Sequence, residues 1–304
     1  MIKILAITPD GKTDALATGI IEGLVQCNDV ELFCTNKGNS AVNIVSAEQA
    51  RELSTIVDYV FVIHGKRPGD YSLLNDIDWE KVVIIDGSEW SFNYLPINNL
   101  GSIKKLVNEE WAKKAKYYFK RECYPQHCAI GIRPLQFTAL DSDFGHHDEE
   151  KTIDVLCAFP RADHHWPDQN AMSYRRMAIN ACKELQDEGY RVVIGTVTDY
   201  LRNVNRSWIT IDAYGGGEFN RRTKQIIANK SALLAKKYQI QLHDLIEDEH
   251  YYAWDSTDEM KSKIRQLLAD KSRLQKLIDR SYDHICKKHT SVAIARYIIK
   301  EITQ

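Results

Sequence analysis

The sequence predicts an α/β protein with two Rossmann-like domains, and three observations support this. Apolar runs of strand length, such as residues 2–7, recur along the 304-residue chain. Segments with helical spacing of apolar residues, such as 173–188, lie between them. Strands that are apolar on both faces and alternate with helices form a parallel sheet covered on both sides. The acidic, non-periodic residues 139–151 divide the alternation, so we expect domains at residues 1–145 and 146–304.

In the first half of the chain, three polar loops follow the carboxyl ends of expected strands. Expected strands lie at residues 2–7, 30–34, 58–63, 81–85 and 116–122, and expected helices at residues 15–27, 47–56 and 109–116. Ligands of parallel α/β sheets bind just beyond the carboxyl ends of the strands. We therefore expect loops 8–11, 64–67 and 86–89 to border a binding site. The alternative for each loop is a plain turn, because Pro-Asp-Gly and Asp-Gly are ordinary turn sequences.

The second half repeats the alternation. Expected strands lie at residues 154–159, 191–194 and 232–235, a short element at 204–211, and expected helices at 173–188, 221–228, 257–268, 271–287 and 291–302. Gly189 ends the first of these helices as a C-cap. The last helix either completes the second domain or packs back on the first.

The composition of the chain disfavours several classes of protein. The chain is 44% hydrophobic and 27% charged with a formal net charge of −2, which disfavours a strongly basic nucleic-acid or membrane-surface binder. It starts directly with a strand, and no apolar run approaches the ~20 residues of a membrane span. Seven scattered cysteines predict a cytoplasmic protein with reduced thiols. Cys123, His127 and Cys128 come nearest to a metal cluster, but no second cluster completes them, so we expect no metal site.

Residues 214–255 contain the clearest candidate for a binding site. Three glycines, Gly215 to Gly217, let the backbone approach a ligand closely. Arg221 and Arg222 follow at the start of a helix. Unpaired N–H groups and the helix dipole favour an anion there, which predicts a phosphate.

Residues 154–302 resemble the glycosyltransferases of GT-B fold, and among them the spore-maturation (CgeB-like) group. The resemblance rests on IDVLCAFPRA with Tyr174-Arg175-Arg176, the glycine turn leading to Arg222-x-x-Gln225, IIANKSALL, and the segment from DLIEDEHYYAWD to KKHT. It implies two domains facing each other across a cleft, and sugar transfer from a nucleotide sugar such as a UDP-sugar, without a cofactor. The family's glutamate and glycine are Gln225 and Lys230 here, which leaves the donor nucleotide open.

The resemblance places the donor in the second domain. Arg222 would hold the pyrophosphate, because a guanidinium offers bidentate contacts and keeps its charge; the alternative is a surface arginine. Gln225 would meet the ribose without charge assistance. The remaining expected donor-binding residues are Tyr214, Gly216, Gly217, Glu218, Asn220, Arg161, Gly195 and Thr196. A plain turn is the alternative for the glycines, and a helix N-cap for Asn220.

Catalysis would take place in the cleft. Inverting transfer needs a base, and the candidates at strand ends of the first domain are Asp86, Glu89, His64 and Asp10, the first two preferred. Retaining transfer would need none of them. Asp141-Ser142-Asp143 matches the Asp-x-Asp pattern of a metal-binding motif, but it falls in the expected linker. We therefore predict metal-independent transfer in which arginine supplies the positive charge.

The acceptor stays open between a glycan, a small molecule, a protein and a modified DNA base. DNA would need a basic patch, and the candidates for it are Lys113, Lys114, Lys116, Lys120, Arg121 and Arg133. The alternative from another class is a non-catalytic nucleotide-sugar or polymer-binding protein, which the departures at Gln225 and Lys230 suggest. A dehydrogenase is disfavoured because no GxGxxG follows the first strand.

Overall fold

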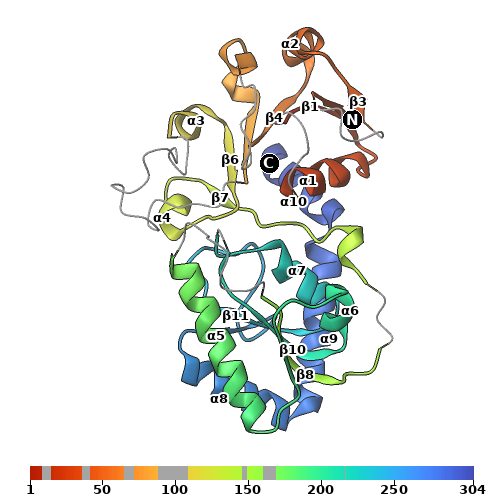
Figure 1. The fold of residues 1–304 in the computed structure, drawn as a ribbon. Helices are drawn as coiled ribbons and strands as arrows, with labels where there is room; N and C mark the ends of the chain where they lie inside the picture. The colour runs from red at the N-terminus through yellow and green to blue at the C-terminus, as the bar shows by residue number, and fades with distance from the viewer. Residues whose placement is uncertain are drawn as a thin grey trace. The chain divides into compact units, whose positions relative to one another are not determined.

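The structure is a computed structural model that describes residues 1–8, 15–35, 42–64, 72–87, 109–145, 149–159, 169–215 and 217–304. The chain divides into two compact α/β units, each built on one parallel sheet (Figure 1). Unit 1 comprises Met1–Thr138, Ile240–His243 and Ser291–Gln304, and unit 2 comprises Ala139–Gln239 and Asp244–Thr290. The α/β class expected from the sequence is confirmed.

Unit 1 contains a parallel sheet with the strand order β3-β2-β1-β4-β5-β6-β7. The strands are β1 (Ile2–Ile7), β2 (Val30–Cys34), β3 (Asn43–Ile44), β4 (Tyr59–His64), β5 (Val82–Asp86), β6 (Tyr117–Lys120) and β7 (Arg133–Pro134). The central strands are almost entirely buried, which explains their continuous apolar sequences. The order changes direction after β1, so β1 and β4 flank the point where ligands bind in such sheets.

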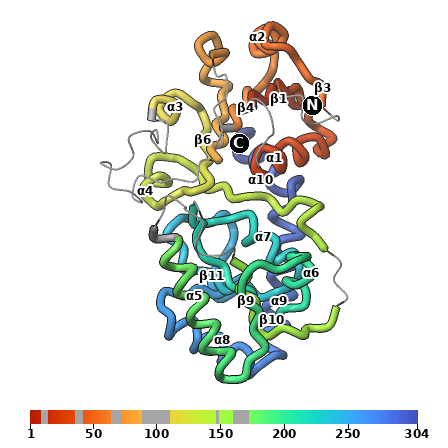
Figure 2. Tube along the Cα trace, in the orientation of Figure 1, coloured from red at the N-terminus to blue at the C-terminus, as the bar shows by residue number. Residues whose placement is uncertain are grey.

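The helices of unit 1 include one from the end of the chain. They are α1 (Ala15–Val25), α2 (Ala47–Ile56), α3 (Glu109–Lys114), α4 (Pro125–Cys128) and α10 (Ser291–Thr303), with 3-10 turns η1 (Ser72–Asn75) and η2 (Trp79–Lys81). Figure 2 shows α10 running beside α1. A Cβ atom on Gly23 would lie 2.0 Å from the Ser291 carbonyl oxygen, so this helix contact requires glycine.

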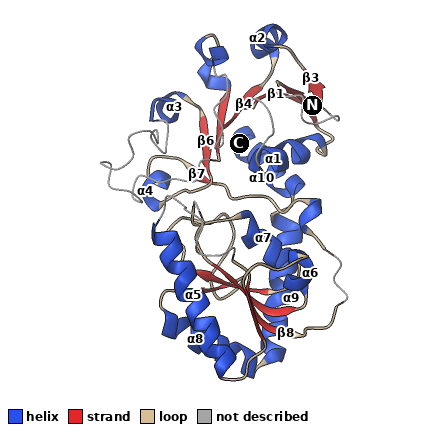
Figure 3. Cartoon of the chain, in the orientation of Figure 1, coloured by secondary structure: helices blue, strands red, loops and turns tan. Residues whose placement is uncertain are grey.

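Unit 2 contains a second parallel sheet with the order β12-β11-β10-β8-β9. Its strands are β8 (Ile153–Cys157), β9 (Val192–Ile194), β10 (Ser207–Asp212), β11 (Ala232–Lys236) and β12 (Tyr252–Trp254). Its helices are α5 (Gln169–Asp187), α6 (Tyr200–Asn205), α7 (Arg221–Ala228), α8 (Thr257–Ala269) and α9 (Lys271–Lys288), with the 3-10 turn η4 (Asp141–Asp143). Figure 3 shows α5 with α8, and α6 with α9, on opposite sides of this sheet.

Two segments differ from the sequence prediction. The short element expected at 204–211 is the helix α6 followed directly by β10. Asp199 starts this helix in the left-handed region at φ 51°, with its carboxylate accepting a hydrogen bond from Arg202 N. The expected linker begins inside unit 2, because the Asp143 carboxylate is fully buried there and holds the first turns of α7.

Candidate functional site

The carboxyl edge of the unit 2 sheet gathers three cationic side chains. Arg175 comes from α5, Arg222 from α7 and Lys236 from the last position of β11. All three are largely buried, with exposed side-chain fractions of 17% for Arg222 and 6% for Lys236 and an exposed residue fraction of 7% for Arg175. Buried cations need anionic or aromatic partners, so their neighbours decide what this edge can bind.

Arg222 is engaged in an ion pair with Asp212, the last residue of β10. Its Nη2 and Nε donate to Asp212 Oδ1 at 2.7 and 3.1 Å, and its Nη1 donates to the Ala158 carbonyl at 3.2 Å. The Thr223 hydroxyl donates to Asp212 Oδ2 at 2.6 Å. Burial is the largest single effect and opposes the charge, but Asp212, Tyr200 and Cys157 together raise the pKa of Arg222. Arg222, which the sequence predicts to bind the pyrophosphate, is therefore already paired with a carboxylate, and this pair links β10 to α7.

Arg175 brings a second guanidinium to the same place. Its Nε donates to the Tyr214 carbonyl at 3.1 Å. The guanidinium carbons of Arg222 and Arg175 lie 4.5 and 5.7 Å from the centre of the Phe159 ring. Burial, followed by repulsion from Arg222, lowers the pKa of Arg175 although Asp212 opposes both effects. An added anion would relieve this unfavourable positive charge.

The glycine turn lies directly against these cations. Gly215 N donates to the Gly217 carbonyl at 2.9 Å. A Cβ atom on Gly215 would lie 2.5 Å from Asn220 Oδ1 and 3.5 Å from Arg175 Nη2. Asn220 occupies the N-cap position of α7, but its side chain makes no capping bond; its Nδ2 donates to the Ala213 carbonyl at 3.3 Å. The turn is thus closed by backbone and amide contacts next to Arg175, and Gly216 lies outside the described residues.

Glu218 and Tyr214 connect this turn to the loop after β11. The carboxylate of Glu218, a residue only 2% exposed, accepts a hydrogen bond from Gln239 N at 2.6 Å. Tyr214 is equally buried and donates its hydroxyl proton to the Lys237 carbonyl. Both residues lie at the expected site, and both hold its framework together.

Lys236 adds an aromatic contact to the edge. Its ammonium pairs with Asp255 and lies 4.7 Å from the centre of the Tyr174 ring, which in turn packs edge-on against Tyr214. Neither Lys236 nor Arg175 is among the site residues predicted from the sequence. Helical phase was the available signal, because Arg175 is three and seven residues before the buried Ala178 and Cys182.

Gln225 turns toward Asp143. Its Nε2 donates to Asp143 Oδ1 at 2.8 Å, and Arg221 Nη2 donates to the same oxygen at 2.6 Å. Asp143 Oδ2 accepts from Leu140 N at 3.0 Å, and the carboxylate is fully buried. A glutamate at position 225 would face this carboxylate, which explains why an uncharged amide suits this chain.

Gly195 and Thr196, which the sequence predicts as donor-binding residues, follow β9. Gly195 has φ +96° and donates its N–H to the Cys157 carbonyl at 3.1 Å, and Thr196 is exposed. They lie at the carboxyl end of the outer strand. Arg161 falls outside the described residues.

The expected catalytic residues belong to unit 1, where Asp86 ends β5. Its Oδ2 accepts from Tyr118 Oη at 2.8 Å and from Lys120 Nζ at 3.0 Å, and the residue is 2% exposed. Deprotonating an acceptor hydroxyl would require this buried group to give up those partners. His64 ends β4 and pairs with Asp86 in the sheet register. Asp10 and Glu89 lie outside the described residues.

Two of the six candidates for a DNA-binding patch are buried in the structure. Lys120 and Arg121 are 0% and 1% exposed, so neither contributes to a surface. Lys114 pairs with Glu110 at 2.6 Å, and Arg133 pairs with Glu301 at 3.1 Å. These contacts leave less positive charge for a phosphate backbone than the sequence indicates.

Two further features concern metals and membranes. Cys123 and Cys128 lie side by side with 3.4 Å between their sulfur atoms, while His127 Nδ1 accepts from Tyr124 N at 3.2 Å. Within the described residues, no three His, Cys, Asp or Glu side chains are grouped as a metal site would need. No helix in the same ranges has the length and apolarity to cross a membrane.

A family model described as glycosyl transferase-like matches residues 149–300, half of the chain. The chain belongs to this glycosyl transferase-like family. It is accordingly an enzyme of the glycosyltransferase class, and the matched residues cover most of unit 2 with its cationic edge. The CgeB-like subgroup is a finer assignment than this match supports.

Solved structures resemble the chain over its full length. A glycosyltransferase from Rickettsia africae has a TM-score of 0.61 at 11% identity, covering 99% of this chain and 98% of that one. Anabaena Alr3699/HepE, solved with UDP and glucose, has a TM-score of 0.61 at 11% identity, covering 100% of both. These similarities confirm the two-domain glycosyltransferase fold. A search of curated protein sequences found no match.

Proposed function

We propose that the chain transfers a sugar from a UDP-sugar to an acceptor hydroxyl without a metal ion, in the manner of the CgeB-like group and in the cytoplasm. The observation that carries this proposal is the guanidinium pair of Arg175 and Arg222 around Phe159, next to the turn at Gly215. The similarly folded Anabaena protein in complex with UDP and glucose supports the choice of nucleotide.

The diphosphate would bind against Arg175. The acceptor oxygen forms a bond to the sugar's anomeric carbon while the bond from that carbon to the β-phosphate oxygen breaks. Negative charge builds on the departing diphosphate, and a fixed guanidinium stabilises it as a metal ion otherwise would. Arg222 would act mainly by holding Asp212 and Phe159, and through them the position of Arg175.

The catalytic base stays a prediction. Asp86 is poorly suited to this role, because it is buried and shared by Tyr118 and Lys120. Glu89, His64 and Asp10 stay open, as does retaining transfer, which would need no carboxylate from unit 1. The acceptor class is equally open between glycan, small molecule, protein and DNA base.

Thermal shifts with nucleoside diphosphates test the donor site. We expect UDP at ~100 times its Kd to stabilise the wild-type chain by about 2.7 kcal/mol. Arg175→Gln should abolish this shift, whereas Arg176→Gln, at the exposed neighbouring position on α5, should retain it. An unchanged shift in Arg175→Gln would disprove the assignment of the diphosphate site.

Turnover separates the enzyme from a binding protein. Release of glucose from UDP-glucose in the absence of acceptor should be measurable for wild type and lost in Arg175→Gln. Tight UDP-sugar binding with no hydrolysis or transfer for any donor or acceptor would favour the non-catalytic alternative.

A further inference from the structure

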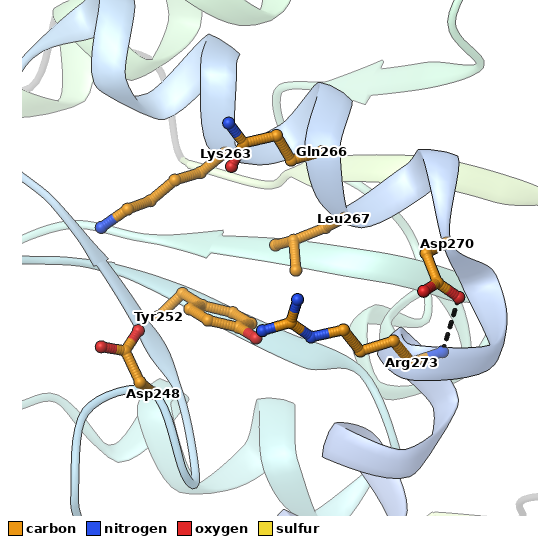
Figure 4. A pocket seen from close by; sticks show the side chains of 7 residues that line it. All are labelled: Asp248, Tyr252, Lys263, Gln266, Leu267, Asp270 and Arg273. Atoms are coloured by element: carbon orange, nitrogen blue, oxygen red, sulfur yellow. Dashed lines mark hydrogen bonds between the residues drawn. The ribbon is translucent and has the colours of Figure 1, made fainter.

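A pocket of about 210 Å³ lies on unit 2 beside the edge strand β12 (Figure 4). Tyr252, the first residue of β12, forms one wall, and Gln266 and Leu267, in the last turn of α8, form another. Helix α8 starts just after the carboxyl end of β12, and Gln266 is nine residues into it, roughly 14 Å along the helix. The pocket is therefore separate from the cationic carboxyl edge of the same sheet.

Three polar side chains around the pocket are available to a ligand. The Asp248 carboxylate, the Gln266 amide and the Arg273 guanidinium make no hydrogen bond or ion pair within the described residues. Arg273 lies in the first turn of α9, where a cation opposes the helix dipole. Figure 4 shows its guanidinium extending toward Tyr252. These three groups offer donors and acceptors from different sides of one cavity.

The rest of the lining is fixed and partly apolar. Tyr252 and Leu267 pack against the core of unit 2, so the pocket has a rigid ring and an aliphatic contact. Lys263 Nζ donates to the Ala253 carbonyl at 2.5 Å and pairs with Glu259 at 2.9 Å. Because Lys263 already donates to that edge carbonyl of β12, pairing of an added peptide strand there is disfavoured.

Charge and size define the ligand class. Lys263 is paired with Glu259, and the Asp270 carboxylate caps α9. This leaves one free charge of each sign, on Asp248 and Arg273, which favours an uncharged ligand. The volume is below the ~300–1,000 Å³ of ordinary ligand pockets and suits one small unit. A sugar ring has an apolar C–H face for Tyr252 and Leu267, and hydroxyl groups for Asp248, Gln266 and Arg273.

We propose that this pocket binds one sugar unit of a neutral glycan, as a second carbohydrate site remote from the donor. Binding of the sugar follows from the pocket alone. Its use for holding the acceptor or product chain rests on the proposed function, and it would favour a glycan acceptor over DNA.

The test uses the full chain and saturation-transfer NMR with methyl glucoside, methyl N-acetylglucosaminide, cellotriose and chitotriose. We expect at least one probe to bind at about millimolar Kd. Tyr252→Leu and Arg273→Met should each weaken it about tenfold, and Lys276→Met, at an exposed position one turn further along α9, should not. All three variants should keep their wild-type thermal shift with UDP.

The outcomes separate the two proposals. No binding of any neutral probe at ~10 mM, wild-type binding in both pocket variants, or tighter binding of glutamate or citrate than of any sugar would each overturn the carbohydrate pocket. Sugar binding that depends on Tyr252, in a chain that shows no response to any nucleoside diphosphate, would leave the pocket standing and overturn the donor site.

Discussion

Replacing Arg222 by alanine tests whether this residue is a donor ligand or a structural cation. The substitution would leave the Asp212 carboxylate, which is 1% exposed, without its guanidinium partner. Removing one member of a buried ion pair costs about 3–5 kcal/mol. Asp212 would keep its hydrogen bonds from Thr223 and from the Ala213 N–H, so we expect the lower end, about 3 kcal/mol.

Thermal and urea unfolding of the apo chain measure this cost. For a chain of this size, about 3 kcal/mol corresponds to a Tm lower by about 6–12 °C. The double variant Asp212→Asn/Arg222→Met removes both charges and should be more stable than Arg222→Ala, because no buried charge is left unpaired. If Arg222→Ala melts within about 2 °C of wild type and loses only its response to UDP, Arg222 is the free phosphate ligand that the sequence predicts and our structural reasoning is wrong.

Two other predictions concern titratable groups of unit 2. Gln225→Glu puts a second carboxylate at the position from which Gln225 donates to Asp143 Oδ1 at 2.8 Å. We expect a loss of about 2 kcal/mol at pH 7, partly offset by Arg221, and recovery below about pH 5 where the new carboxyl is protonated; equal urea midpoints at pH 7 would contradict this. Burial, and then the stacked His284, lower the pKa of His250 to about 4. The folded state therefore favours the neutral His250 ring. Its contribution to the free energy of unfolding is complete above about pH 6.5 and falls by on the order of 2 kcal/mol toward pH 4. His250→Asn keeps an acceptor for Ile246 N and should flatten that part of the stability curve, and an unchanged acid slope would refute the assignment.

The layered α/β fold was accessible from the sequence because parallel strands and their covering helices leave strong local patterns. Strands such as Val82–Asp86 are buried on both faces and read as continuous apolar runs. The boundary between the units was harder to predict from the sequence. Asp143 lies in a polar, acidic stretch that looks like a linker, and only its three-dimensional contacts with Arg221 and Gln225 show that it is a buried anchor.

The position of the glycine turn in the fold was predictable from the sequence, and the partners of its neighbouring side chains were less so. The glycine turn and the start of α7 do lie at the carboxyl edge of a sheet, as expected for a phosphate site. The partner of each cation could not be read from the chain, because Asp212 and Arg222 come from different elements. The helical phase of Arg175 was a usable signal that required treating a charged residue as part of a buried face.

The structure gives a physical reason for the departure from the family pattern at position 225. In the sequence, glutamine in place of glutamate raises the question of lost activity. In the structure, the Gln225 amide donates to a buried carboxylate that also binds Arg221, so the substitution removes a like-charge contact between two neighbouring acids. Asp143 thereby gives a structural reason for the uncharged amide at this position. The donor site that we propose rests on Arg175, which lies against the turn at Gly215, while Gln225 and Arg222 pair with carboxylates of their own unit.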